Sequence, residues 1–289
     1  MIIGFLGKGG SGKSTLSFLF THYASERFKK VLAIDADHNM DLTFQFDPNW
    51  NGPYFGSSLT DIKKRVGFED DVRTGDVFLS GGENIKDTFS LEPADPYTKE
   101  YSKPVAEKVL LMSAGPHTDA ILHDESCSHV LTTSLKIYLP LLALGKDEFV
   151  IVDEKAGADG AGTGVSSGLD LAVIVSEPTV QGTKVAKQIA SLLDFYGTPH
   201  VFLGNKVLDK EDEGFLRKNL DSDILIFNFD QKWLRPSTSH LTDFKKSSQK
   251  TMEKIIERAK EKPSDRFERS RKKFERNRSR IPTKTSEQN

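Results

Sequence analysis

The chain has 289 residues, of which 37% are hydrophobic and 28% are charged, and its formal net charge of -2 gives no indication of a polyanionic partner. A single cysteine excludes an intramolecular disulfide framework and favours a reducing compartment. Met1 leads directly into an apolar run without a basic signal region, and no apolar run approaches the ~20 residues of a membrane span, so we expect a cytoplasmic protein with no transmembrane segment.

Short apolar runs alternate with segments of helical length along most of the chain. This alternation predicts an α/β protein of the doubly wound type, in which a mostly parallel sheet is covered by helices on both faces. We expect strands at residues 2–6, 31–34, 109–112, 149–152, 171–175, 201–203 and 224–227. We expect helices at about 13–28, 57–66, 129–145, 180–196, 211–220 and 242–262.

We divide the chain into a domain at residues 1–240, with an irregular insertion at about 47–107, and a C-terminal part at 241–289. The insertion is rich in proline and glycine, which interrupt any long periodic pattern. After Pro263 the chain is basic and poor in apolar residues, a composition that predicts a disordered tail with weak, salt-dependent contacts to nucleic acid or an acidic partner. Its Phe267, Phe274 and Ile281 form a stripe too narrow for a membrane anchor.

Residues 7–14 match the phosphate-binding pattern G-x-x-x-x-G-K-[ST]. The match follows an apolar run and precedes a predicted helix, where such a P-loop binds the phosphates of a nucleotide. Lys13 would reach the β- and γ-phosphates, Ser14 would place its hydroxyl on Mg²⁺, and Thr15 would lie near the α-phosphate. A glycine-rich turn without a ligand is the alternative, but strand, spacing, lysine, hydroxyl and helix all favour binding. The candidate binding residues are Gly9, Gly10, Ser11, Gly12, Lys13, Ser14 and Thr15.

Acidic side chains follow two of the predicted strands. Asp35, Asp37 and Asp41 come after the run at 31–34, and Asp153 ends the run at 149–152. Because the carboxyl ends of parallel strands meet at one edge of a sheet, these acids should lie beside the P-loop. Asp153 has the form of a Walker B acid, which holds Mg²⁺. For Asp35 alone, a functional role beside the P-loop and a structural role as a strand-end or helix-capping carboxylate are equally open.

Lys8 extends the P-loop to Lys-Gly-Gly-Ser-Gly-Lys-Ser, which resembles the deviant Walker A signature. That signature marks the family of MinD, ParA, the nitrogenase iron protein, the arsenite-pump ATPase and the CooC-type nickel-insertion ATPases. The resemblance implies a slow, Mg²⁺-dependent ATPase that forms an ATP-sandwich homodimer, with Lys8 acting in trans on the nucleotide of the partner. It also implies that Asp37 orients the attacking water and that Asp41 is associated with Mg²⁺. Without the family, Lys8 could be a solvated loop lysine.

Three further stretches carry the resemblance. Asp-Ala-Asp-His-Asn-Met-Asp at 35–41 resembles the first switch, with His38 and Asp41 departing from the CooC-type pattern, and the glycine-rich segment at 154–162 resembles a mobile second switch. Gly-Asn-Lys-Val at 204–207 lacks the acid of the guanine-reading motif, because Leu208 stands at that position. In this family the asparagine contacts adenine, so we assign Asn205 to the base of ATP.

Cys127 and His129 stand where CooC-type proteins carry Cys-x-Cys. In a two-fold dimer they would supply two thiolates and two imidazoles, a set suited to Zn²⁺ or Ni²⁺. This resemblance implies a role in maturing a client metalloprotein. The alternatives are a buried packing cysteine and, for the whole protein, a MinD- or ParA-like positioning ATPase that binds membrane or nucleoid. Electron transfer through a shared iron–sulfur cluster is excluded, because the cluster takes four thiolates and a dimer has two cysteines.

Overall fold

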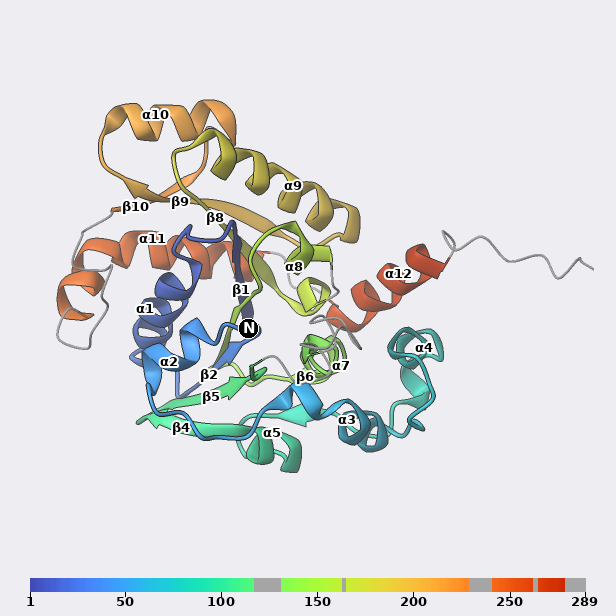
Figure 1. The fold of residues 1–289 in the computed structure, drawn as a ribbon. Helices are drawn as coiled ribbons and strands as arrows, with labels where there is room; N and C mark the ends of the chain where they lie inside the picture. Colours follow the sequence, from blue (N-terminus) through green and yellow to red (C-terminus); the bar gives the residue numbers. More distant parts are fainter. Residues whose placement is uncertain (117–130, 163–164, 229–240, 262–264, 279–289) are drawn as a thin grey trace, which may run out of the picture.

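The computed structural model describes residues 1–116, 131–162, 165–228, 241–261 and 265–278 (Figure 1). An eight-stranded sheet runs through the molecule in the order β10-β9-β8-β1-β7-β2-β5-β4, and every pairing in it is parallel except that of β4 with β5. A mostly parallel sheet was predicted and is confirmed. The strands are β1 Ile2–Gly7, β2 Lys30–Asp35, β4 Ser102–Ala106, β5 Val109–Ser113, β7 Glu148–Asp153, β8 Leu171–Ser176, β9 His200–Val207 and β10 Leu225–Asn228.

Helices cover both faces of this sheet (Figure 1). They are α1 Lys13–Ser25, α2 Asp41–Phe46, α3 Leu59–Val66, α4 Thr74–Leu79, α5 Pro96–Tyr101, α7 Leu135–Leu141, α8 Ala158–Gly162, α9 Val180–Tyr196, α10 Lys210–Asn219, α11 Leu241–Glu261 and α12 Arg266–Arg278. Short 3₁₀ turns lie at Phe55–Ser57, Gly82–Asn84 and Val165–Gly168, and a small second sheet pairs β3 Phe89–Ser90 with β6 Leu142–Ala143.

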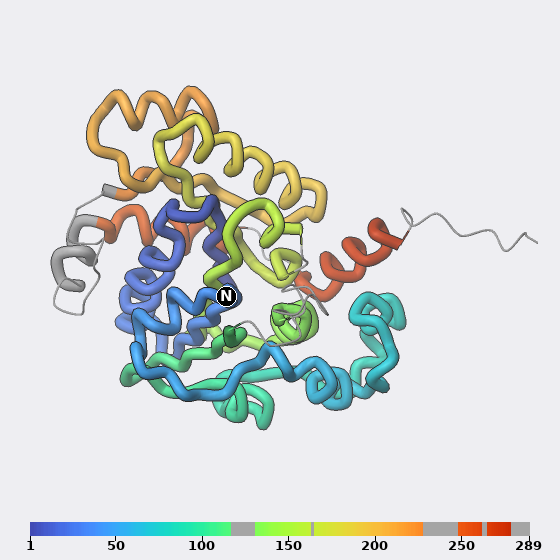
Figure 2. The backbone as a smooth tube through the Cα atoms, in the orientation of Figure 1, coloured from blue at the N-terminus to red at the C-terminus, as the bar shows by residue number. Residues whose placement is uncertain are grey.

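Alternation along each strand divides the core in two. On β1, Ile3 and Phe5 point to the face covered by α1 and α11, while Ile2 and Leu6 point to the face covered by α7 and α9. Strands buried on both faces read as continuous apolar runs, which is why the sequence revealed them. Figure 2 shows α11, near the end of the chain, lying beside α1, near its start. Helices α1 and α11 therefore lie in the same layer, although most of the chain separates them in sequence.

The predicted helix at 129–145 is longer than the observed one. Residues 129 and 130 lie outside the described part, and α7 ends at Leu141, where the chain turns extended to form β6. Pro140 weakens the last turn of this helix, because it lacks the N–H that would bond the carbonyl four residues earlier. The predicted insertion contains the short elements α3, α4, α5, β3 and β4. Its aromatic residues join the main core; for example, the ring centroids of Phe89 on β3 and Tyr138 on α7 lie 5.0 Å apart.

The predicted disordered tail is wrong for residues 266–278, which form α12 and pack on the core. Ser270 is fully buried and its hydroxyl lies 2.9 Å from that of Ser167. Arg269 donates to the Ser167 carbonyl at 2.8 Å, and Phe267 and Phe274 both contact the ring of Phe78 on α4. Charged and small residues make much of this contact, so composition alone indicated disorder. Residues 279–289 lie outside the described part.

Within the described residues, no helix combines the length and the apolar character that crossing a membrane requires.

Candidate functional site

Close packing and backbone conformation set the path of the P-loop. A Cβ atom added at Gly7 would lie 2.5 Å from the Val175 carbonyl oxygen, so only glycine fits beside β8. Gly10 and Gly12 have φ angles of +79° and +94°, which glycine adopts without strain. Gly12 is also the residue that precedes α1, so the loop leads directly into the amino-terminal end of that helix. This end of a helix favours an anion.

Lys13 points into the site from the first turn of α1. Its Nζ lies 3.6 Å from Asp37 Oδ2, and both side chains are almost fully buried. Burial alone would lower the pKa of Lys13, but the surrounding aspartates, of which Asp153 and Asp37 contribute most, raise it. The amine therefore keeps its charge at neutral pH and is available to a phosphate.

The loop and α2 enclose a pocket of about 240 Å³. Most of the predicted phosphate and magnesium ligands line it together, but Gly9, Ser11 and Asp153 do not: Gly9 is exposed, and Ser11 and Asp153 are buried. Asp41 and Gln45 form the wall contributed by α2, and the buried Gln45 Oε1 has no hydrogen-bond partner among the described residues. The lining residues are Gly10, Gly12, Lys13, Ser14, Thr15, Asp41, Gln45 and Lys206.

Asp153 ends β7, directly beside Asp35 at the end of β2. Its Oδ1 accepts a hydrogen bond from Ser17 Oγ at 3.2 Å, and its buried Oδ2 has no partner among the described residues. Burial raises the pKa of Asp153, against the attraction of the Lys13 charge. A buried carboxylate oxygen without a donor is satisfied by a cation, so this acid and the nearby Ser14 hydroxyl fit Mg²⁺.

Asp35 has a structural position. Its Oδ2 accepts from both the backbone N–H and the hydroxyl of Thr43, each at 2.8 Å, and its Oδ1 accepts from the Asp37 N–H at 3.2 Å. Burial and the neighbouring charge of Asp153 raise the pKa of Asp35 to about 7. Of the two roles that the sequence left open, the contacts fit the structural one, because this carboxyl fastens α2 to the end of β2 and so places Asp37 and Asp41.

Asp37 is 2% exposed and does not itself line the pocket, but it contacts Lys13, which does. Besides the contact with Lys13, its Oδ1 accepts from the Asn39 N–H at 3.1 Å and lies 3.5 Å from His38 Nδ1. Lys13 and the turn at 37–39 thus orient the carboxylate.

The other side of the P-loop is held by residues at the ends of β8 and β9. Asn205 Nδ2 donates to the Ser11 carbonyl at 2.8 Å, and its buried Oδ1 has no partner among the described residues. Lys8 Nζ lies 2.9 Å from Glu177 Oε1, and Lys206 Nζ lies 3.8 Å from Glu177 Oε2. Sequence reasoning missed Glu177, Lys206 and Gln45 as site residues. The position of Lys206 next to Asn205, and of Gln45 one helical turn after Asp41, were the available signals.

The glycine-rich segment after β7 is joined to the P-loop, since the Gly157 N–H donates to the Gly7 carbonyl at 2.9 Å. Part of it forms α8, with Asp159 in the first turn. Cys127 and His129 lie outside the described residues. Within the described ranges, no group of three or more His, Cys, Asp or Glu side chains could hold a metal ion, so Zn²⁺ or Ni²⁺ has no support there.

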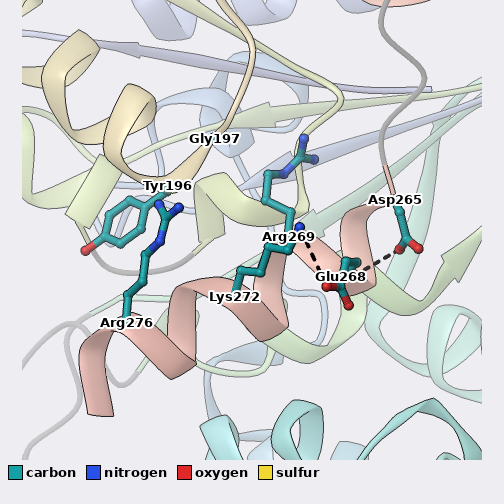
Figure 3. Close-up of a pocket in the computed structure, with 7 residues that line it drawn as sticks. All are labelled: Tyr196, Gly197, Asp265, Glu268, Arg269, Lys272 and Arg276. Atoms are coloured by element: carbon teal, nitrogen blue, oxygen red, sulfur yellow. Dashed lines mark hydrogen bonds and ion pairs between the residues drawn. The ribbon is translucent and has the colours of Figure 1, made fainter. Parts of the chain in front are cut away.

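A larger cavity, of about 380 Å³, lies between α12 and the end of α9 (Figure 3). It is rich in cationic side chains, but these already have partners. Arg269 donates to the Ser167 carbonyl, Arg276 donates to the Phe195 carbonyl, and Lys272 lies 3.7 Å from Glu268. The smaller P-loop pocket differs, because strand ends, a helix amino terminus and unsatisfied polar atoms converge there.

The chain is similar to known nucleotide-binding proteins. Residues 2–266 match the family model described as the CobQ/CobB/MinD/ParA nucleotide binding domain. The chain is 30% identical over 227 residues to the carbon monoxide dehydrogenase accessory protein CooC of Rhodospirillum rubrum, covering 76% of this chain and 80% of CooC. It is 29% identical over 239 residues to an uncharacterised ATP-binding protein of Methanocaldococcus jannaschii, covering 78% of this chain and 86% of the relative.

Solved structures show the same fold. The septum site-determining protein MinD of Pyrococcus horikoshii, complexed with Mg-ADP, superimposes with a TM-score of 0.55 and 17% identity over 90% of this chain and 94% of MinD. A plasmid partition protein of Borrelia burgdorferi, bound to AMPPNP, superimposes with a TM-score of 0.55 and 15% identity. The match covers 88% of this chain and 98% of the partition protein. Because the family model matches most of this chain, the chain belongs to the CobQ/CobB/MinD/ParA nucleotide-binding family.

Proposed function

We propose that the chain binds and hydrolyses ATP with Mg²⁺ and that ATP drives it from monomer to dimer. The observation that carries this proposal is the buried pair of Asp37 with Lys13, which lines the P-loop pocket and also feels the charge of Asp153, whose Oδ2 is unsatisfied. A charged lysine, a carboxylate and an unsatisfied acid at one point are the groups that phosphoryl transfer to water requires.

In this proposal Lys13 exchanges its contact with Asp37 for a contact with the β- and γ-phosphates. The exchange frees Asp37, which is held by the Asn39 N–H, to accept a hydrogen bond from the attacking water. Ser14 and Asp153 would hold Mg²⁺, with Asp41 on the facing wall, and the ion would supply positive charge to the phosphate oxygens. The unpaired Oδ1 of Asn205 is an acceptor, which suits the amino group of adenine.

Lys8 has a separate role in the proposal. It is the more exposed of the two loop lysines, with 37% of its side chain accessible, and it sits against Glu177 rather than in the pocket. A partly exposed lysine of the P-loop that lies outside the pocket can reach a nucleotide bound by a second copy of the chain. We therefore assign Lys8 to the phosphates of the partner subunit in an ATP-bound homodimer.

For the output of the switch, we propose assistance in maturing a client metalloprotein. The support is the 30% identity to CooC, whose name gives it as an accessory protein of carbon monoxide dehydrogenase. The positioning alternative drew its support from the basic tail, and much of that tail is now the packed helix α12. A transition metal held by Cys127 and His129 stays a prediction.

Two measurements test these levels separately. Sedimentation with and without MgATP, together with phosphate release, tests the switch: wild type that stays monomeric and releases no phosphate would refute it. Equilibrium dialysis with Zn²⁺ and with Ni²⁺ tests the metal, using wild type, Cys127→Ser and His129→Ala, each with and without ATP. The proposal expects metal bound by the wild type in the presence of ATP and lost in both variants. Equal metal binding by all three proteins would refute the proposed metal site without contradicting the proposed ATPase activity.

A further inference from the structure

Two adjacent side chains at the end of β9 hold two adjacent carbonyl groups of the P-loop. Asn205 Nδ2 donates to the Ser11 carbonyl at 2.8 Å, and Lys206 Nζ donates to the Gly10 carbonyl at 2.5 Å. These contacts join residues almost two hundred positions apart in the chain. The packing is close, because a Cβ atom at Gly12 would lie 2.4 Å from Asn205 Nδ2. The loop is thus braced from outside as well as by its own glycines.

Lys206 reaches this position through an unfavourable backbone conformation. Its φ angle is +59°, one of two positive values at non-glycine residues in the described part of the chain. Such a conformation costs a lysine about 1 kcal/mol or more. Strain of this kind persists where the surroundings require a particular direction of the side chain, and here that direction leads to the Gly10 carbonyl.

The amine of Lys206 is also placed by charge. Glu177 Oε2 lies 3.8 Å from it, while Oε1 of the same carboxylate lies 2.9 Å from Lys8 Nζ. Lys206 lines the P-loop pocket, whereas Asn205 does not. Both side chains bind carbonyl oxygens, the groups that would repel a phosphate if they turned toward it. Removing either donor frees one of these carbonyls to rotate toward the ligand.

We propose that Asn205 and Lys206 are positioning residues for the triphosphate, which hold the Gly10 and Ser11 carbonyls so that the phosphate subsite exists before the nucleotide arrives. This inference rests on the proposed nucleotide binding and adds to it. Asn205 then acts on the phosphates through the loop, in addition to its contact with the base. Lys206 acts through the loop, rather than as a direct phosphate ligand or a support for the base.

Inorganic tripolyphosphate, which has neither ribose nor base, separates these roles. Calorimetry would compare its binding and that of ATP, each with Mg²⁺, to wild type, Asn205→Ala and Lys206→Met. We expect both variants to bind tripolyphosphate about 10-fold more weakly, as the loss of one hydrogen bond in a preformed site implies. Lys206→Met should weaken ATP by the same factor, and KM should rise more than kcat falls.

Three further variants serve as controls. Lys206→Asn tolerates a positive φ but has no amine, so it should lose as much affinity as Lys206→Met, while Lys206→Arg should recover most of it. Lys210→Met makes the same charge change on an exposed lysine of α10 and should bind both ligands as wild type does. Circular dichroism spectra would verify that each variant is folded. If Lys206→Met is not folded, Lys206→Asn still tests the loss of the amine.

Two results would overturn the inference. If Lys206→Met weakens ATP but not tripolyphosphate, Lys206 supports the base or ribose. If Lys206→Met weakens tripolyphosphate but Asn205→Ala does not, Lys206 is a direct phosphate ligand and there is no brace. Wild type that binds neither ligand would instead refute nucleotide binding itself. The proposed nucleotide binding and the positioning roles of Asn205 and Lys206 are therefore refuted by different results.

Discussion

Replacing Lys273 of α12 by methionine should stabilise the protein at neutral pH. The side chain is 2% exposed, and its Nζ has no hydrogen-bond partner among the described residues. It lies 3.9 Å from the centre of the Tyr196 ring, and Lys136 of α7 and Glu154 after β7 are the charged groups that influence it. Burial, with a smaller contribution from Lys136, lowers the pKa of Lys273 from 10.5 to about 7.

The sign of the pH dependence follows from this lowered pKa. Between pH 7 and 10.5 the folded state binds fewer protons at Lys273 than the unfolded state, so the contribution of this residue to stability rises with pH. At pH 7 the buried amine costs on the order of 4 kcal/mol, and at pH 10 the cost falls to about 1 kcal/mol. Methionine has a similar length and no charge, so it removes this cost and loses only the contact with the ring, worth about 1 kcal/mol.

Glu154 does not reverse the prediction. Burial raises its pKa to about 8, so at pH 7 it is mostly a neutral acid and loses little attraction when Lys273 is removed. At pH 10 it is ionised, but Lys273 is then neutral in the wild type. No pH therefore offers a strong ion pair for the variant to lose.

The assay is urea denaturation of wild type and Lys273→Met at pH 7 and pH 10. Lys272→Met, at the exposed neighbour on the same helix, is the matched control and should change stability little at either pH. Lys273→Met should gain roughly 3 kcal/mol of stability at pH 7, and this gain should nearly disappear at pH 10. A gain that is equal at both pH values, or a loss at pH 7, would refute this prediction.

Three other outcomes are expected. Lys13→Ala should weaken ATP binding by about 10- to 100-fold. Lys8→Ala should bind ATP nearly as wild type does but fail to dimerise. If calorimetry shows equal losses of ATP affinity in both variants, Lys8 has no trans role. Asp37→Ala should keep the ATP-bound dimer on a sizing column while phosphate release falls about 100-fold or more, and wild-type turnover would assign the water to another acid such as Asp41 or Asp159. A chain ending at Glu261 should be less stable than one ending at Arg278 by roughly 3 kcal/mol, because Phe78 loses its contacts with Phe267 and Phe274. Equal midpoints of urea unfolding for the two chains would contradict the packing of α12.

The central strands and the P-loop were predictable because each follows a local rule. β1, β7 and β8 are continuous apolar runs, and the glycine, lysine and hydroxyl spacing of the P-loop is set by the phosphates that such loops bind. The strand-end position of Asp153 follows from the same local pattern. These elements need no knowledge of distant contacts.

The parts that were missed depend on distant contacts. α12 buries Arg269, Ser270 and Lys273 against residues about a hundred positions earlier, and polar side chains that are buried this way read as solvated in a sequence. β4 is a short edge strand that contains Pro104, which weakens any strand pattern. The role of Asp35 depends on Thr43, eight residues later and across a turn. In each case the role of the residue depends on the residue that it contacts in the folded structure, and the local sequence does not identify that contact.

The two lysines of the P-loop share a feature that bears on the switch. Lys13 is paired with Asp37 and Lys8 with Glu177, so each cation that a triphosphate would attract is held by a carboxylate of the same chain. The buried pair is nearly inaccessible, while the Lys8 pair is more than one third exposed on its lysine side and is correspondingly weaker. In the proposed switch, a triphosphate would exchange the Lys13–Asp37 contact for contacts between Lys13 and its own oxygens. The Lys8 of a second subunit would exchange Glu177 for the same phosphates, which are present only after the nucleotide has bound. We therefore expect nucleotide binding first and dimer formation second.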